Sequence, residues 1–139
     1  MFPSDANPAG NVFGGAILKH IDMVAGIVAQ RYSQTNAVTV SMDKISFLKP
    51  VFVGNVLFVN ARVNYVQKSS MEIEVNVEAE DISKGTRVHT GNAYVTFVAL
   101  DDNGKPTPVP TLCIGTPEDQ KRFDEGKLRM EKRMKQRKN

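Results

Sequence analysis

The alternation of apolar and polar residues between Met71 and Asp81 constrains the fold of this chain more than any other pattern. Positions 71, 73, 75 and 77 are apolar, whereas positions 72, 74, 76 and 78 are polar. Successive side chains of a strand point to opposite faces, so this pattern predicts a strand with one buried face and one polar face. Such strands are typical of antiparallel sheets.

Three further segments have the composition of strands, and turn sequences separate them. The expected strands are Val38–Phe47, Asn55–Gln67 and Arg87–Leu100. Residues 68–70, 83–85 and 101–104 have turn chemistry, and Pro50 and Gly54 separate the first two strands. Neighbouring strands joined by such short connections must run antiparallel, so we expect a sheet of four strands that pair in chain order.

A long apolar helix is predicted before these strands, over Ala16–Tyr32. Ile17, Ile21, Val24 and Val28 recur at helical spacing, and the helix is apolar on most sides, which predicts deep burial. A mid-helix Gly26 costs about 1 kcal/mol relative to alanine, so we expect another element to cross it closely. The sheet is expected to curl around this helix and to leave an open edge. An open edge favours pairing with a second copy, which predicts a dimer with a continuous sheet.

The segment from Asp5 to Asp22 carries the residues with the clearest chemistry. The pair Gly14-Gly15 leads into the helix, where free backbone N–H groups attract negative charge. Asp22 follows two turns later, about 11 Å away, which is too far for both to hold one small atom within a single chain. We therefore expect the carboxylate of one chain and the helix start of another to meet across a two-fold axis. Asn7 is either a turn residue or an amide that holds a water or a carbonyl oxygen, and Asn11 is a turn or cap residue.

Charge and composition exclude several classes of function. Residues 1–117 carry a net charge of −1 and residues 118–139 a net charge of +4, so the basic character belongs to the tail and does not favour nucleic-acid binding. A single cysteine, no signal peptide and no apolar run of about 18–20 residues indicate a cytoplasmic protein without a membrane segment. His20, His89 and Cys113 lack the spacing of a metal site or of a nucleophile with its base, and no nucleotide-binding fingerprint is present.

Residues 117–139 form a basic tail with acids early and bases late, as the helix dipole prefers. A solvated or frayed helix is the preferred interpretation, and a lid or a subunit contact is the alternative. The expected organisation is a domain over residues 1–116 followed by this tail.

Several segments together resemble the hotdog-fold acyl-CoA thioesterases, in particular the bacterial short acyl-CoA hydrolases and the cytosolic acyl-CoA hydrolases of animals. They are Pro3–Gly15, Ile21–Ala29, Val38–Asp43, Phe47–Val51, Ser69–Val75, Phe97–Asp101 and Pro108–Pro110. The resemblance covers essentially the whole chain. It implies an α+β hotdog fold and an enzyme that hydrolyses fatty acyl-CoA to the free acid and CoA. The family normally has a short strand before the Pro-Ser-Asp motif, whereas this sequence begins at Met1-Phe2-Pro3, so either the numbered chain lacks its true N-terminus or that strand is reduced.

The resemblance also implies roles for individual residues. Asp22 is the base that activates water, or alternatively a nucleophile, and Asn7 of the partner subunit assists it. The thioester oxygen binds at the N–H groups of Gly15 and Ala16, where a removed donor typically costs about 10²–10³ in rate. Residues bordering the substrate are Gly14, Asn11 and Phe13. Candidates for contacts with CoA are Lys68, Lys44, Lys49, Arg62, Ser69 and Ser70.

No metal and no cofactor beyond the CoA of the substrate is implied, and dimers are expected to assemble into a hexamer. Two other interpretations stay open. One is a non-catalytic acyl-CoA sensor on the same fold. The other is a hotdog hydratase, in which a histidine would act with the aspartate; His20 lies on the opposite flank of the helix from Asp22. The preferred acyl length is not determined by any single residue.

Overall fold

The computed structural model describes residue 2 and residues 14–138, with side chains described as far as residue 135. Its elements are α1 (Gly14–Ser33), β1 (Asn36–Phe47), β2 (Val56–Gln67), β3 (Ser70–Asp81), β4 (Thr86–Leu100) and α2 (Pro117–Lys138). Every predicted helix and strand is confirmed, with ends that differ by no more than two residues. The paired glycines are part of α1, so they form its first turn instead of preceding it.

The four strands form one antiparallel sheet in the order β1-β4-β3-β2. The expected pairing in chain order is correct for β2–β3 and β3–β4, but it is wrong for β1, which pairs with β4. Residues 48–55 carry the chain from one edge of the sheet to the other. The backbone N–H groups of Leu48 and Lys49 donate to the Thr90 carbonyl at 2.7 and 3.3 Å. These bonds hold the residues that follow β1 against β4. A Cβ atom at Gly91 would lie 2.6 Å from the Ser46 carbonyl oxygen, so only glycine permits this approach.

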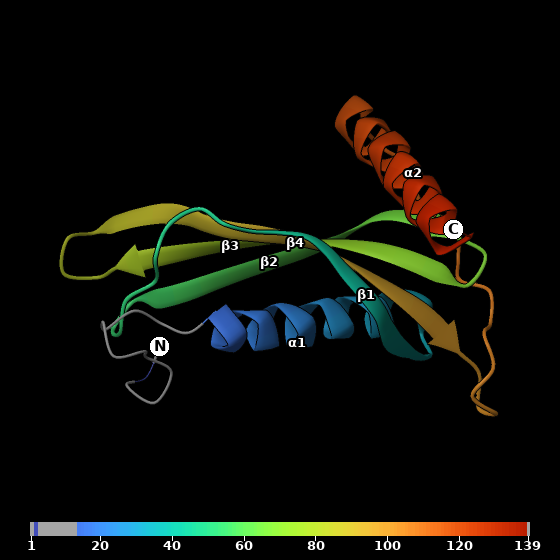
Figure 1. Cartoon of the computed structure of the whole chain (residues 1–139), viewed down its shortest axis with the longest axis horizontal. Helices are drawn as coiled ribbons and strands as arrows, with labels where there is room; N and C mark the ends of the chain where they lie inside the picture. The colour runs from blue at the N-terminus through green and yellow to red at the C-terminus, as the bar shows by residue number, and fades with distance from the viewer. Residues whose placement is uncertain (1, 3–13, 139) are drawn as a thin grey trace.

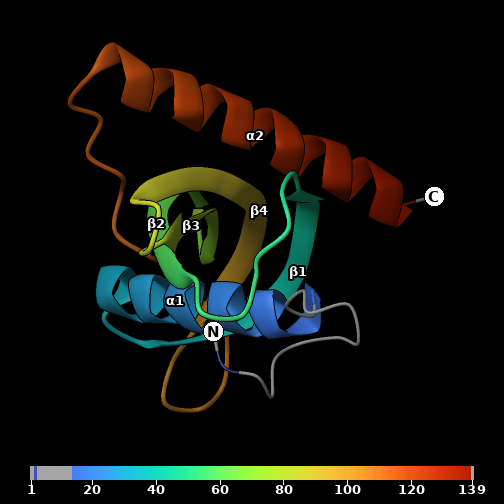
Figure 2. The same ribbon diagram turned by 90° about the vertical axis from the view of Figure 1, so that its left-hand side faces the viewer.

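The core lies between α1 and the concave face of the sheet, which curls around the helix (Figure 2). Ile21, Ala25 and Ala29 of α1 are buried against the apolar positions of β3 and β4, including Ile73 and Val95. The small alanines bring the helix close to the sheet. Burial of this apolar surface, at about 25 cal/mol per Å², is the main stabilising contribution.

The expectation that α1 is deeply buried on most sides is wrong for the side that faces away from the sheet. Met23 and Ile27 are 54% and 51% exposed in the single chain. The helix therefore presents a second apolar side that no described element covers.

Helix α2 packs on the convex face of the sheet, so the sheet lies between the two helices (Figure 1). Arg129 donates to both carboxylate oxygens of Glu72 at 2.9 and 2.6 Å, and Met130 is 4% exposed. A Cβ atom at Gly126 would lie 2.7 Å from Cβ of Tyr65, so the helix backbone lies directly on β2. The preferred interpretation of a solvated or frayed tail is therefore wrong. The acidic position 72 of the alternating strand is covered by this helix and paired, not exposed.

Within the described residues, no helix is both long enough and apolar enough to span a membrane.

Candidate active site

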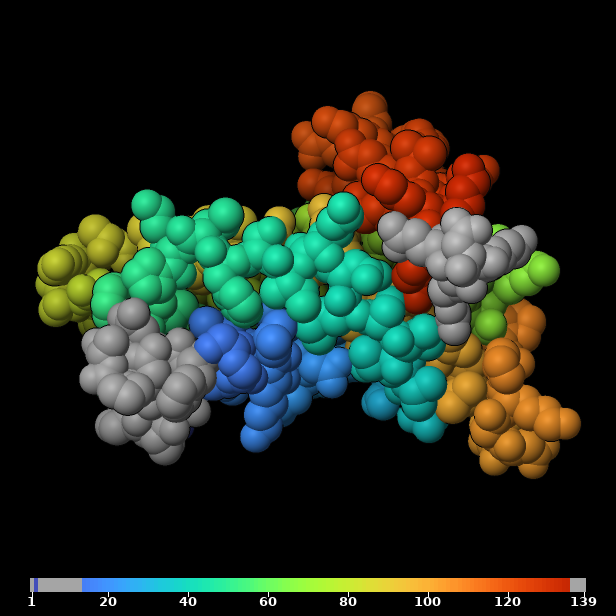
Figure 3. Space-filling model, viewed as in Figure 1, coloured from blue at the N-terminus to red at the C-terminus, as the bar shows by residue number. Residues whose placement is uncertain are grey.

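The side chains of Asp22 and Thr39 meet at the open edge of the sheet. Thr39 Oγ1 donates a hydrogen bond of 2.8 Å to Asp22 Oδ1. Asp22 belongs to α1 and Thr39 to β1, and both are exposed in the single chain. The two elements lie side by side on the face shown in Figure 3. An ionised carboxylate held by a hydroxyl in this way keeps its second oxygen available to accept a proton.

The tight connection between α1 and β1 produces this pairing of residues 17 positions apart. Gln34 adopts a left-handed conformation with φ 58° and donates its N–H to Gln30, which ends the helix. Ser33 Oγ donates to the Ala29 carbonyl, and the Thr35 N–H donates back to Ser33 Oγ. The chain therefore reverses within three residues, and β1 runs back along α1. Thr39 then lies beside Asp22, about three helical turns before the reversal point.

The start of α1 lies at the other end of β1. A Cβ atom at Gly14 would be 3.6 Å from the Phe47 ring, and Phe47 is eight residues further along β1 than Thr39. At Gly15 no described atom lies within 4 Å of the Cβ position, and the first turn holds no acidic residue. The first-turn N–H groups of Gly15 and Ala16 are the kind of donors that bind an anion or a carbonyl oxygen at a helix start. They do not share a small site with Asp22 of the same chain.

Three predicted site residues, Asn7, Asn11 and Phe13, lie outside the described residues.

The residues predicted to contact CoA do not converge. Lys68 and Ser69 form the β2–β3 turn, and Ser70 is the first residue of β3; Lys68 has φ 52°, and Ser70 pairs with Val98 of β4. That turn lies two strands away from β1. Arg62 and Lys44 lie on the convex face, which is the opposite side of the sheet from Asp22. Lys49 lies in the connection between β1 and β2. The role of each of these residues stays a prediction.

Other kinds of site receive no support from the described part of the chain. It contains no group of three or more His, Cys, Asp or Glu side chains placed to hold a metal ion. Cys113 is a free, exposed cysteine.

Sequence reasoning missed Thr39. It lies in the segment Val38–Asp43 that carries the family resemblance, but a threonine in a β-branched strand has an ordinary structural explanation. Thr39 is identified as a site residue by its position beside Asp22 of α1. Only the reversal at Gln34 places it beside Asp22.

Comparison with known proteins gives concordant results. The family model described as "Thioesterase superfamily" matches residues 9–86. The cytosolic acyl coenzyme A thioester hydrolase of Rattus norvegicus is 43% identical over 129 residues, which is 91% of this chain and 34% of that protein. The chain therefore spans about a third of the length of this relative.

Solved structures agree in fold. The acyl-CoA hydrolase of Staphylococcus aureus, in complex with butyryl-CoA, CoA and CoA disulfide, has a TM-score of 0.90 and 36% identity, over 99% of this chain and 84% of that one. An apo hexameric acyl-CoA thioesterase has a TM-score of 0.92 and 33% identity, over 98% of this chain and 87% of that one. These likenesses confirm the predicted fold, a sheet curled around one long helix. Alanine variants of an asparagine, an aspartate and a threonine of the S. aureus hydrolase have also been solved.

Proposed function

This chain belongs to the thioesterase superfamily, and we propose that it hydrolyses acyl-CoA thioesters with Asp22 as the general base. The observation that carries the proposal is the hydrogen bond of 2.8 Å between Thr39 and Asp22. The three residues varied in the S. aureus hydrolase lie 15 and 17 positions apart, and Asn7, Asp22 and Thr39 have the same residue types and spacing. The proposal assigns these three residues to one site.

In the proposed reaction, Asp22 Oδ2 accepts a proton from a water molecule whose oxygen attacks the thioester carbonyl carbon. The hydroxyl of Thr39 holds Oδ1 and so orients the carboxylate. The N–H groups of Gly15 and Ala16 stabilise the negative charge that develops on the carbonyl oxygen. The C–S bond then breaks, the thiolate of CoA takes up the proton, and the acid is released. One base, one water and an oxyanion site suffice, so the proposal includes no cofactor.

The proposed active unit is a dimer. Among the described residues, Asp22, Met23 and Ile27 are exposed on α1, and β1 is an edge strand of the sheet. A second copy that packs on this side would cover the carboxylate and continue the sheet. It would also supply the helix start that the distance along α1 denies to a single chain, and the proposal includes Asn7 of that second copy in the site. We further propose that such dimers assemble into a hexamer and work in the cytoplasm, by analogy with the hexameric thioesterase and the cytosolic relative.

The test replaces Asp22 by asparagine, which keeps the shape of the side chain but removes its basicity. We expect Asp22→Asn to bind CoA as the unchanged chain does and to lose thioester hydrolysis by about 10³-fold or more, measured by free-thiol release over short to long acyl-CoAs. Asp102→Asn, in an exposed turn, is the matched control and is expected to keep full activity.

Other outcomes would contradict the proposal. Unchanged turnover in Asp22→Asn would exclude the aspartate as the base. Binding of acyl-CoA by the unchanged chain without thiol release would favour the non-catalytic sensor. Water addition to an enoyl-CoA without thiol release would favour the hydratase.

A further inference from the structure

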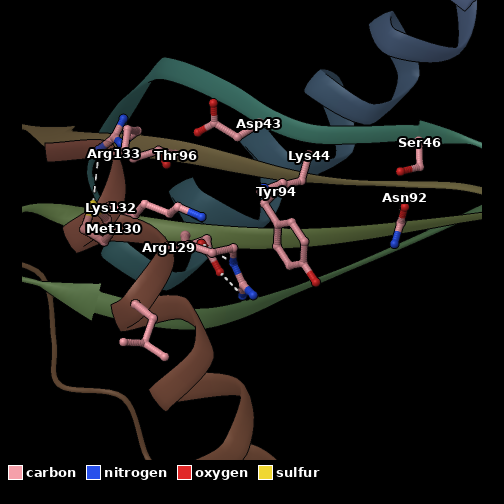
Figure 4. A pocket seen from close by; sticks show the side chains of 12 residues that line it. Asp43, Lys44, Ser46, Asn92, Tyr94, Thr96, Arg129, Met130, Lys132 and Arg133 are labelled. Atoms are coloured by element: carbon pink, nitrogen blue, oxygen red, sulfur yellow. Dashed lines mark hydrogen bonds and ion pairs between the residues drawn. The ribbon is translucent and has the colours of Figure 1, made fainter. Parts of the chain in front are cut away.

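A groove of about 690 Å³ lies between α2 and the convex face of the sheet (Figure 4). Its floor is formed by side chains of β1, β3 and β4, among them Tyr94 and Asn92, and its wall by Arg129, Lys132 and Arg133 of α2. This volume lies within the range of small-molecule sites, about 300–1,000 Å³. None of the side chains placed in the proposed reaction lines it.

The groove carries an excess of positive charge. Within the described part of the chain, Lys44, Lys132 and Arg133 have no carboxylate within 4.0 Å, whereas Arg129 is neutralised by Glu72. Arg133 instead donates to Ser41 Oγ at 2.7 Å. Among the residues that line the groove, Asp43 is the only acid besides Glu72, and Ser41 Oγ donates to it at 3.2 Å. Three unpaired cations therefore face one carboxylate, which favours an anionic ligand.

A polar group inside the groove also lacks a partner. Asn92 Oδ1 is buried, and no hydrogen-bond donor reaches it among the described residues. A buried carbonyl oxygen without a donor costs about 1–3 kcal/mol, so a bound group with an N–H or O–H would relieve that cost. Ser46 lines the groove beside it and pairs with Asn92 across the β1–β4 ladder.

A bulge in β1 shapes the groove next to Asn92. The ladder with β4 is irregular between Asp43 and Ser46, and Lys44 within this bulge has a left-handed φ of 54°. Bulges redirect side chains, and they are over-represented beside functional sites. A non-glycine residue in this conformation is uncommon, and here it carries one of the three unpaired cations.

The groove is separate from the Asp22–Thr39 pair. Thr39 contacts α1 on the concave side of the sheet, whereas Asp43, Tyr94 and Glu72 line the convex side. A ligand in the groove and a substrate at Asp22 of the same chain therefore lie on opposite faces of the sheet.

We propose that this groove binds a phosphorylated ligand of nucleotide size. Its phosphates contact Lys44, Lys132 and Arg133, and a hydroxyl or amino group of its nucleoside donates to Asn92 Oδ1. Charge selects the phosphates, because Arg and Lys are the side chains that recognise them. The unpaired carbonyl of Asn92 selects a nucleoside over a bare phosphate. The proposal does not depend on the hydrolase activity.

Calorimetric titration of the full chain with ADP at low salt tests the proposal. We expect one ADP per chain, with an affinity that falls as salt rises. The double variant Lys44→Asn/Lys132→Gln removes two cations, and its asparagine tolerates the left-handed backbone; we expect at least 10-fold weaker binding. Lys84→Gln, in the β3–β4 turn, is the matched control and is expected to bind ADP as the unchanged chain does.

Two further arms identify the ligand. Asn92→Ala is expected to weaken ADP and to leave inorganic pyrophosphate unaffected. Displacement of ADP by CoA would identify the nucleotide end of CoA as a natural occupant, and ADP binding unaffected by CoA would identify a free nucleotide.

Asp22→Asn is expected to bind ADP normally, which separates this site from the proposed reaction. The proposal is overturned if ADP at millimolar concentration gives no binding heat, or if the double variant binds it as well as the unchanged chain.

Discussion

Thr39 donates its hydroxyl hydrogen to Asp22 over 2.8 Å, and this bond joins the edge strand β1 to the exposed side of α1. Both residues are exposed, and they lie where α1 meets the edge strand of the sheet. The geometry therefore joins the proposed chemistry and the proposed dimer at one place, because whatever covers this edge also covers the carboxylate.

Replacing Thr39 by valine keeps its shape and removes the bond to Asp22. Hydrogen bonds to charged groups contribute about 1.5–3 kcal/mol, so we expect kcat for acyl-CoA hydrolysis to fall roughly 10- to 150-fold with little change in KM. Thr39→Ser retains the hydroxyl and is expected to restore most of kcat. Equal loss in the serine and valine variants would show that the methyl group, not the hydroxyl, is what matters.

The uncovered side of α1 predicts how assembly and activity depend on each other. Ile27→Glu places a charge on this side, and burial of an unpaired charge costs several kcal/mol. We expect sedimentation analysis to show a shift to monomers, together with loss of hydrolysis and an unchanged circular dichroism spectrum. Ile82→Glu, at a residue 66% exposed in the β3–β4 turn, is the control and should leave assembly intact. Oligomeric and fully active Ile27→Glu protein would refute the proposed interface.

Two helical glycines predict opposite effects of the same substitution. At Gly26 a new Cβ atom would lie 3.8 Å from the Phe97 ring, an ordinary contact, so Gly26→Ala should raise the free energy of unfolding by about 1 kcal/mol. At Gly126 it would lie 2.7 Å from Cβ of Tyr65, so Gly126→Ala should lower the free energy of unfolding by about 1–3 kcal/mol. Urea denaturation measures both values. A stabilising Gly126→Ala would mean that α2 does not pack against β2 in solution.

The pair between Glu72 and Arg129 predicts a strong dependence of stability on both partners. The Glu72 side chain is 4% exposed, so Arg129→Met leaves a buried carboxylate without its cation. Such loss costs about 3–5 kcal/mol, which urea denaturation should detect. The double variant Glu72→Gln/Arg129→Met removes the charge as well and is expected to recover most of the loss. Stability that the single variant leaves unchanged would exclude the pair as an anchor of α2.

The β3–β4 turn predicts a pH dependence. The hydroxyl of Ser83, together with the backbone N–H groups of Ser83 and Lys84, donates to Asp81 and holds the pKa of that carboxyl below its usual value of 3.8. A lowered pKa in the folded chain stabilises it above pH 3.8, and this contribution is lost as the pH falls through the lowered value. The stability difference between the unchanged chain and Asp81→Ala is therefore expected to shrink only in that acidic range. A difference independent of pH in acid-unfolding curves would contradict this.

Much of the fold could be predicted because its signals are local. The alternation over Met71–Asp81 and the helical spacing of Ile17 and Ile21 identify strand and helix without knowledge of their neighbours. The pairing of β1 with β4 could not be predicted from such local patterns. It depends on the Thr90 carbonyl and on the space at Gly91, which are contacts between residues far apart in the chain.

The helix α2 shows a similar limit. Its composition indicates a solvated helix, because its charges exceed its apolar residues. Arg129 is nevertheless a partner of Glu72, 57 residues away, and a pattern within one segment does not reveal a partner in another. The sequence does not reveal the groove beside α2 for the same reason, although Lys44 is among the residues predicted to contact CoA.

The sequence by itself determined the elements, the family resemblance and Asp22 as the candidate base, since these depend on residue type and spacing along one segment. The tertiary structure decided which side of α1 is buried, that Thr39 holds Asp22, and that α2 covers the convex face of the sheet. The physical reason is that hydrogen bonds and van der Waals contacts act over a few ångströms in space. Only the folded chain brings residues 17 or 57 positions apart within that distance.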